Sequence, residues 1–194
     1  AVVILDNRSF DIISKAILLI CTLTAPRLGL QLLKNFLAPN IDTIIQSCNK
    51  LNKSIHISRD LHSDATIEFL QNNNIDIILN ARTRAYFKKK LLSIPKVGCF
   101  NVHHGILPKQ RGLMCDFWAL LYNQPKGFSI HRMTSKIDDG EVLYVEEVQE
   151  DRNNYLASTL ASSYKEYRAI EKIFDLLSQN KDIKIQAQDD SQDI

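Results

Sequence analysis

The sequence has few cysteines, and none of them has the spacing of a metal or redox site. Its four cysteines, Cys21, Cys48, Cys99 and Cys115, are scattered over 194 residues without a Cys-x-x-Cys pair. This pattern argues against a zinc knuckle or a thioredoxin-like motif. We expect reduced, mostly buried thiols in a cytoplasmic protein. The five histidines show no close ligand spacing either, so no metal is predicted.

The chain also lacks a strong charge bias and a long apolar run. Lys and Arg number 24 against 22 Asp and Glu, a net charge of +2, so neither nucleic acid nor an anionic membrane is the expected partner. The longest apolar run, residues 16–23, is too short to span a bilayer, and we interpret it as a helix. The 45% hydrophobic content is that of a soluble globular protein. We predict one domain over residues 1–180 and a polar tail over residues 181–194.

Strand-like and helix-like segments alternate along the chain. Strands are expected at 1–5, 54–58, 75–79, 97–102, 128–133 and 142–148, with a short one possible at 183–185. Helices are expected at 16–23, 41–51, 64–71, 116–122 and from about 151 to 177, and Asp64 is expected to cap the third of them. The buried face of the last helix is expected to consist of Leu156, Leu160, Tyr164, Tyr167, Ile170, Phe174 and Leu177. The order predicts an α/β fold, largely parallel in its first half and antiparallel or mixed in its second.

The stretch 99-CFNVHHGILPKQRG-112 stands where one predicted strand ends. Ligands of open α/β sheets collect at the carboxyl ends of strands. Asn101 and His103 are separated by one residue, which places both side chains on one face of a strand and His104 on the other. An amide donor and an imidazole could together hold a carbonyl oxygen and manage protons. A carboxylate partner is available at Asp138 or Asp139, on a turn before Gly140.

These features have simpler explanations when each is taken alone. A His-His pair is more often a surface or capping feature, and an Asp-Asp-Gly segment is usually only a turn. The full pattern, however, resembles the formyltransferases that use 10-formyltetrahydrofolate. It consists of Asn101-Val102-His103, Leu107-Pro108, Arg111-Gly112, 127-GFSIHRM-133 and Ile137-Asp138-x-Gly140, in that order. The resemblance implies a Rossmann-like catalytic domain, which here lacks the first strand of the family fold.

The resemblance also implies roles for individual residues. Asn101 and a protonated His103 would stabilise the oxyanion, and Asp138 would tune His103 and help to remove the amine proton. No metal is needed for direct transfer. The formyl donor would be contacted by Arg84, Tyr86, Phe87, Thr134, Lys136 and Ile137. His104, which stands where many members have proline, would lie on the acceptor side together with Lys109 and Arg111.

The acceptor is the part that the sequence leaves most open. The segment 107–112 with 130-IHRM-133 is most similar to members that formylate nucleotide-linked amino sugars, so a small-molecule amine is our first expectation. Members acting on methionyl-tRNA or on glycinamide ribonucleotide are alternatives. A formyltetrahydrofolate deformylase is a further one, because deformylases often carry a histidine after Asn-x-His, as His104 does here. A homodimer would be compatible with each of these.

Overall fold

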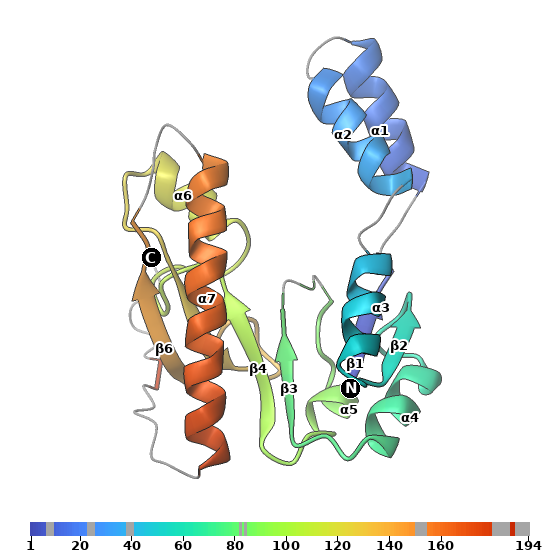
Figure 1. The fold of residues 1–194 in the computed structure, drawn as a ribbon. Helices are drawn as coiled ribbons and strands as arrows, with labels where there is room; N and C mark the ends of the chain where they lie inside the picture. Colours follow the sequence, from blue (N-terminus) through green and yellow to red (C-terminus); the bar gives the residue numbers. More distant parts are fainter. Residues whose placement is uncertain are drawn as a thin grey trace. The chain divides into compact units, whose positions relative to one another are not determined.

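Strands and helices alternate along the chain, as the sequence predicts (Figure 1). The computed structural model describes residues 1–6, 10–22, 26–37, 41–81, 83, 85–149, 155–179 and 187–188. Within these residues the chain divides into two units, Ala1–Asn73 and Asn74–Ile194.

The first unit contains a small parallel sheet and four helices. Its elements are β1 (Val2–Leu5), α1 (Phe10–Cys21), α2 (Pro26–Leu37), α3 (Ile41–Lys50), β2 (Ile55–Ser58) and α4 (Asp64–Asn72). β1 pairs with β2 in parallel, and α1 packs against α2. The predicted strands and helices of this region are present, whereas α2 was not foreseen.

The start of α4 differs by one residue from the sequence-based expectation. Its N-cap is Ser63, whose backbone is extended and whose hydroxyl accepts a hydrogen bond from the Thr66 N–H at 3.3 Å. The prediction that Asp64 caps the helix is therefore wrong. Asp64 is the first helical residue, where a negative charge still suits the helix dipole.

The second unit is built on a four-stranded mixed sheet. Its elements are β3 (Ile77–Asn80), α5 (Lys89–Leu92), β4 (Gly98–His103), α6 (Cys115–Leu121), β5 (Gly127–Arg132), β6 (Val142–Glu147) and α7 (Tyr155–Ser178). The strands lie in the order β3-β4-β5-β6; β3 and β4 are parallel, and the other two pairs are antiparallel. The predicted change from parallel to antiparallel pairing is confirmed, with the strands distributed over two sheets.

One face of this sheet forms the hydrophobic core beneath α7 (Figure 1). Alternate residues point to opposite faces of a strand, so the apolar members of β4 and β5 share the α7 side. The buried core consists of Phe100, Val102, Phe128, Ile130, Leu143, Val148, Ala169 and Ile173. Asn101, His103, Ser129 and His131 lie between these residues in the sequence, so they occupy the opposite face.

The buried face of α7 matches the sequence-based expectation only in part. Ile170 and Leu177 pack against the core as predicted, and the side chains of Leu156 and Leu160 lie outside the described residues. Tyr164 and Tyr167 were expected in the core, yet their exposed fractions are 62% and 57%. Ser162 and Glu166 are buried instead, and the Ser162 hydroxyl donates a hydrogen bond to Glu166 Oε1 at 2.9 Å. Two buried polar side chains that hydrogen-bond to each other avoid the cost of leaving a polar group unpaired. The spacing of apolar residues along the helix gives no sign of such a pair.

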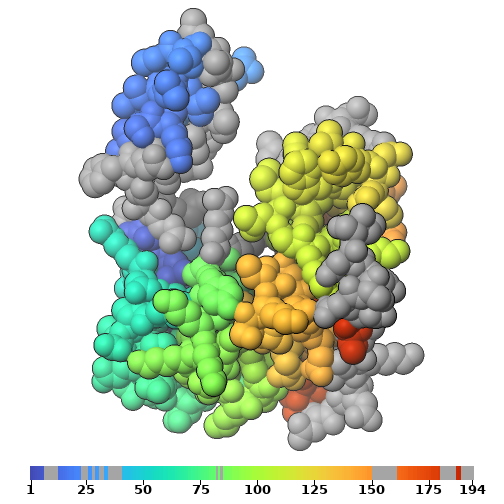
Figure 2. Space-filling view, turned by 180° about the vertical axis from the view of Figure 1, so that it is seen from behind, coloured from blue at the N-terminus to red at the C-terminus, as the bar shows by residue number. Residues whose placement is uncertain are grey.

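The surface around α6 carries several large apolar side chains. Phe117, Trp118, Leu121 and Tyr122 are all exposed, and they belong to the yellow segment in Figure 2. Trp118 stacks on Tyr122 and meets the Phe117 ring edge-on. The aromatic residues therefore cover one another in part while remaining on the surface.

The expectation of one domain over residues 1–180 remains a prediction. Most of the predicted tail, including the suggested strand at 183–185, and residues 151–154 of the predicted last helix lie outside the described residues.

Candidate active site

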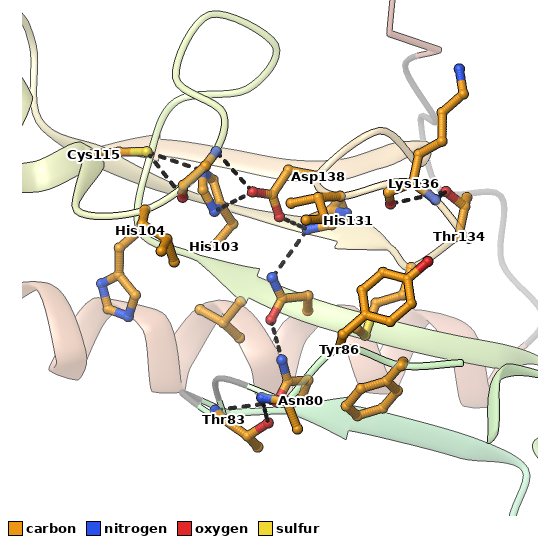
Figure 3. A pocket seen from close by; sticks show the side chains of 18 of the residues that line it. Asn80, Thr83, Tyr86, His103, His104, Cys115, His131, Thr134, Lys136 and Asp138 are labelled. Atoms are coloured by element: carbon orange, nitrogen blue, oxygen red, sulfur yellow. Dashed lines mark hydrogen bonds and ion pairs between the residues drawn. The ribbon is translucent and has the colours of Figure 1, made fainter. Parts of the chain in front are cut away.

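A cavity of about 610 Å³ opens on the face of the β3-β4-β5-β6 sheet that α7 does not cover (Figure 3). All of its lining residues belong to the second unit. They come from the ends of β3, β4 and β5, from the segments 83–87 and 133–138, and from residues 112–116 before and at the start of α6. The cavity therefore lies beside the carboxyl ends of the parallel strands β3 and β4, where ligand sites of α/β sheets are found.

The structure brings Asn101, His103 and Asp138 together along this cavity. Asn101 and His103 project from one face of β4. Asp138 arrives from the turn after β5, with a left-handed backbone (φ 51°) that asparagine and aspartate tolerate better than most residues. Its Oδ2 lies 3.4 Å from His103 Nδ1. The three residues that the sequence singles out are thus neighbours in space.

His103 is held by oxygen atoms on both sides of its ring. Nε2 lies 2.5 Å from the Gln110 carbonyl oxygen, while Nδ1 faces Asp138. A neutral ring carries one N–H, so only the imidazolium can donate to both oxygens. Burial nevertheless lowers the pKa of His103, and the Asp138 carboxylate and the Gln110 carbonyl, which raise it, do not fully offset burial. The lowered pKa favours a neutral His103 in the free protein at pH 7, in contrast to the protonated His103 that the resemblance implies.

Asp138 is buried, with 9% of its surface exposed, yet it is surrounded by groups that favour its charge. Its Oδ2 accepts a hydrogen bond from the Gly112 N–H at 3.0 Å, and its Oδ1 lies 3.4 Å from His131 Nε2. Burial raises the pKa of Asp138, but the contacts with His131, His103 and Gly112 outweigh burial and leave that pKa below its ordinary value. The carboxylate is ionised at neutral pH.

The site contains polar residues that the sequence-based list of site residues did not include, among them Asn80 and His131, which both contact Asn101. His131 pairs with Asn101 across the antiparallel strands β4 and β5, and the Asn101 Nδ2 group lies 3.2 Å from His131 Nε2. Asn80 pairs with Asn101 across the parallel strands β3 and β4. The alternation in 127-GFSIHRM-133 gave a signal for His131, because it places that side chain opposite the core-facing Ile130.

Most of the residues predicted to contact the formyl donor line the same cavity. They are Tyr86, Phe87, Thr134, Lys136 and Ile137. Phe87 is buried and Tyr86 half-exposed, and the Tyr86 hydroxyl donates a hydrogen bond to the Ser135 carbonyl. This contact ties the segment after β3 to the loop before Asp138. Arg84 lies outside the described residues.

The three residues predicted for the acceptor side are separated by the structure. His104 lines the cavity, but its Nδ1 lies 3.4 Å from Glu166 Oε1 on α7, so its ring points away from His103 as strand alternation predicts (Figure 3). Lys109 and Arg111 are not among the lining residues. Arg111 donates hydrogen bonds to Gln188 Oε1 and lies 3.8 Å from Asp139 Oδ1.

Two further observations complete the description of the site. The described residues include no group of three or more His, Cys, Asp or Glu side chains that could hold a metal ion. Within the same residues, no helix has both the length and the apolar character that crossing a membrane requires.

One strand presents an amide and an imidazole to the cavity, and a turn adds a carboxylate; this combination is suited to acid–base catalysis of group transfer. Comparison with known proteins identifies the family to which the chain belongs. The family model described as formyl transferase matches residues 17–171, which is more than half of the chain. The chain belongs to the formyl transferase family.

Relatives in sequence include two kinds of protein. The bifunctional polymyxin resistance protein ArnA of Wigglesworthia glossinidia brevipalpis is 33% identical over 130 residues, covering 64% of this chain and 19% of that protein. The methionyl-tRNA formyltransferase of Thermotoga neapolitana is 37% identical over 86 residues, covering 44% of this chain and 28% of that protein. The chain thus spans less than a third of the length of either relative.

Solved structures agree on the fold. A 4-N formyltransferase from Francisella tularensis matches with a TM-score of 0.60 at 24% identity, over 77% of this chain and 60% of that one. The formyltransferase PseJ from Anoxybacillus kamchatkensis, in complex with UDP-4,6-dideoxy-4-formamido-L-AltNAc and tetrahydrofolate, matches with a TM-score of 0.56 at 23% identity, over 77% of each chain. A phosphoribosylglycinamide formyltransferase from Anaplasma phagocytophilum matches with a TM-score of 0.63 at 18% identity, over 75% of this chain and 74% of that one. The Rossmann-like α/β expectation is confirmed at this level.

Proposed function

We propose that this protein is an N-formyltransferase that moves a formyl group from 10-formyltetrahydrofolate to a primary amine. The observation that carries the proposal is the convergence of Asn101, His103 and Asp138 on one cavity, with Asp138 Oδ2 3.4 Å from His103 Nδ1. Membership of the formyl transferase family supports the same reaction.

The cavity suits a folate donor. Phe87 and Tyr86 offer aromatic surface at one end, and the loop containing Thr134 and Lys136 offers backbone and side-chain polar groups beside them. Cofactor sites of this kind combine apolar walls with a few convergent polar atoms. The bound donor would supply the formyl group, whose carbonyl carbon the acceptor amine attacks.

Each member of the trio has a distinct part in this reaction. Asn101 donates an N–H to the formyl oxygen as negative charge develops on it. His103 is neutral before the reaction. The proton that the attacking amine loses passes to the Asp138–His103 pair, which leaves His103 as an imidazolium; the pair then returns a proton to N10 of the donor as the bond between N10 and the formyl carbon breaks and tetrahydrofolate leaves. The resulting imidazolium has an oxygen acceptor for each N–H, one on Asp138 and one on Gln110. The geometry therefore stabilises His103 in the state that it reaches during transfer.

The acceptor that we favour is the amine of a nucleotide-linked amino sugar. A formyltransferase structure that matches over 77% of this chain holds such a formylated UDP-sugar, and the segment 107–112 resembles the sugar-directed members. His104 and residues 112–116 line the cavity, and we assign them to the acceptor. Lys109 and Arg111 are weaker candidates for substrate contact, since neither lines the cavity.

A methionyl-tRNA acceptor is the second candidate, because methionyl-tRNA formyltransferases are among the sequence relatives at 30–37% identity. The two acceptors are separated by one assay. The protein is incubated with 10-formyltetrahydrofolate and, in parallel, with a panel of amino-sugar nucleotides, methionyl-tRNA, glycinamide ribonucleotide, or no acceptor.

Mass spectrometry of the acceptors and the absorbance of released tetrahydrofolate report the outcome. A gain of one formyl group on an amino-sugar nucleotide supports the favoured acceptor. Formylation of methionyl-tRNA alone identifies the second candidate. Tetrahydrofolate release that needs no amine would instead identify a deformylase and overturn the proposal.

A further inference from the structure

Asn80 is a buried polar residue at the carboxyl end of β3, with 6% of its surface exposed. Because β3 and β4 are parallel and Asn80 pairs with Asn101, the two carboxamides lie side by side on the cavity face of the sheet. Asn80 Nδ2 donates a hydrogen bond to Asn101 Oδ1 at 2.8 Å. The carboxamide of Asn101 is thus held by a residue outside the proposed trio.

The orientation of Asn80 is itself fixed. Its Oδ1 accepts a hydrogen bond from the Thr83 backbone N–H at 3.3 Å (Figure 3), so its amino group is the end left to face Asn101. A reversed Asn80 would place two N–H groups against each other at Thr83. The backbone after β3 therefore determines which atom of Asn80 meets Asn101.

This contact determines which atom of Asn101 faces the rest of the site. With Oδ1 turned toward Asn80, Nδ2 is turned toward His131, whose Nε2 lies 3.2 Å away. The same His131 Nε2 also lies 3.4 Å from Asp138 Oδ1. Because Nδ2 of Asn101 carries two protons, at least one is left to donate into the cavity that Asn101 lines.

We infer that Asn80 is a positioning residue that keeps the amide N–H of Asn101, rather than its carbonyl oxygen, available to the reacting group. The inference rests on the proposed function for its catalytic consequence, but the orientation of the amide is a property of the free protein. Without the Asn80 donor, Asn101 could reverse and present an oxygen to a developing negative charge.

The sharpest variant is N80D, which preserves shape and replaces the amino donor by an acceptor. The carboxylate introduced by this substitution would repel Asn101 Oδ1 and attract Nδ2, which reverses the amide. Loss of a single oxyanion donor lowers kcat by roughly 100- to 1,000-fold. Because reversal is incomplete, we expect kcat of N80D to fall about 10- to 100-fold, with KM for donor and acceptor changed by less than about 3-fold.

N73D is the matched control. Asn73 also uses Nδ2 as a donor, to the Phe69 carbonyl at 2.7 Å, but it lies at the end of α4, outside the cavity lining. N73D should keep the wild-type kcat. In an N101A background, N80D should lower the residual rate by less than about 2-fold, whereas a merely structural role of Asn80 would lower the rate in both backgrounds.

The side-chain amide signal of Asn101 in ¹⁵N–¹H NMR, assigned by its loss in N101D, gives a readout independent of activity. It should shift in N80D and not in N73D. Wild-type rate and an unshifted signal in N80D would overturn the inference. If the wild-type protein transfers no formyl group, the proposed function fails while a shifted Asn101 signal still supports positioning. Should N80D not fold, N80S, whose hydroxyl is too short to reach Asn101, is tested in the same two ways.

Discussion

Asp138 Oδ2 lies 3.4 Å from His103 Nδ1, and the same oxygen accepts the Gly112 N–H at 3.0 Å. One carboxylate therefore orients the imidazole and anchors the segment that leads into α6. The chemistry proposed for His103 and the shape of the cavity beside residues 112–116 depend on a single side chain.

Replacing Asp138 by asparagine should reduce formyl transfer strongly without unfolding the protein. The change keeps the shape of the side chain but removes the charge that stabilises protonated His103. Positioned acid–base groups contribute roughly 100- to 10,000-fold, so we expect kcat to fall within that range. The rate of tetrahydrofolate release under saturating donor and acceptor measures it.

D139N provides the matched control for D138N. Asp139 is adjacent in sequence, but it pairs with Lys136 and Arg111 and does not line the cavity. D139N should retain more than about half of the wild-type kcat, because Asp139 is only partly buried and its partners lie outside the trio, and substitutions away from key contacts usually have small effects. Equal losses in the two variants would mean that the turn, and not the Asp138 carboxylate, is what matters.

The stability of the protein should depend on pH through His103. Burial lowers its pKa from the ordinary 6.5, so below pH 6.5 the unfolded chain binds a proton that the folded protein resists. The stability that His103 contributes is present above pH 6.5 and is lost as the pH falls from there toward the folded-state pKa. We expect the midpoint of urea unfolding to drop over this interval more steeply for the wild type than for H103Q.

Asp138 acts on stability in a different pH range. Its pKa is held below the ordinary 3.8, so its contribution disappears only under more acidic conditions. Comparing H103Q with the wild type between pH 7 and pH 5 therefore isolates the histidine. Identical pH profiles for the two proteins would contradict a buried, neutral His103.

Local patterns were sufficient for part of the site. Strand alternation places Asn101 and His103 on one face and His104 on the other, because side-chain direction in a strand depends only on parity. The partnership of Asn80 and His131 with Asn101 requires the register of three strands, which no local spacing contains. Arg111 could not be placed from its surroundings either, since its partner Gln188 is 77 positions away in the chain.

The face of α7 is a second case in which local pattern was insufficient. Tyr164 and Tyr167 carry apolar rings, so they were assigned to the core, and Glu166 was not considered for burial. In the folded unit Glu166 can be buried because its carboxylate contacts the hydroxyl of Ser162 and the ring of His104. Whether a polar residue can be buried depends on partners that other segments supply.

A substitution pair tests this corrected face of α7. Ile173 is 2% exposed in the core against the sheet, so I173A should lower the free energy of unfolding by roughly 2–5 kcal/mol. Tyr167 is 57% exposed, so Y167A should change it by no more than about 0.5 kcal/mol. Urea denaturation followed by circular dichroism measures both. A larger loss for Y167A than for I173A would instead support the sequence-based expectation that Tyr167 lies in the core.

The thiol of Cys115 should be slow to react although it lies beside the proposed catalytic histidine. Burial, together with the negative charges of Asp138 and Asp116, raises the pKa of this thiol to about 11, and its Sγ lies 3.6 Å from His103 Nε2. At pH 8 only about one thiol in 1,000 is then a thiolate, the form that reacts with iodoacetamide. Cys21 is exposed, so peptide mass spectrometry should find it alkylated well before Cys115.

D138N should speed the modification of Cys115, because it removes one of the charges that hold this pKa high. D139N should leave the rate unchanged, since Asp139 is not among the groups that raise it. The alkylation rates of these two variants therefore test the electrostatic effect of the Asp138 carboxylate without an activity assay. Suppose that D138N abolished formyl transfer yet left the alkylation rate of Cys115 unaltered. In that case the negative charge of Asp138 would have no electrostatic effect on Cys115 or on the neighbouring His103. The electrostatic part of the proposed mechanism would then have to be abandoned.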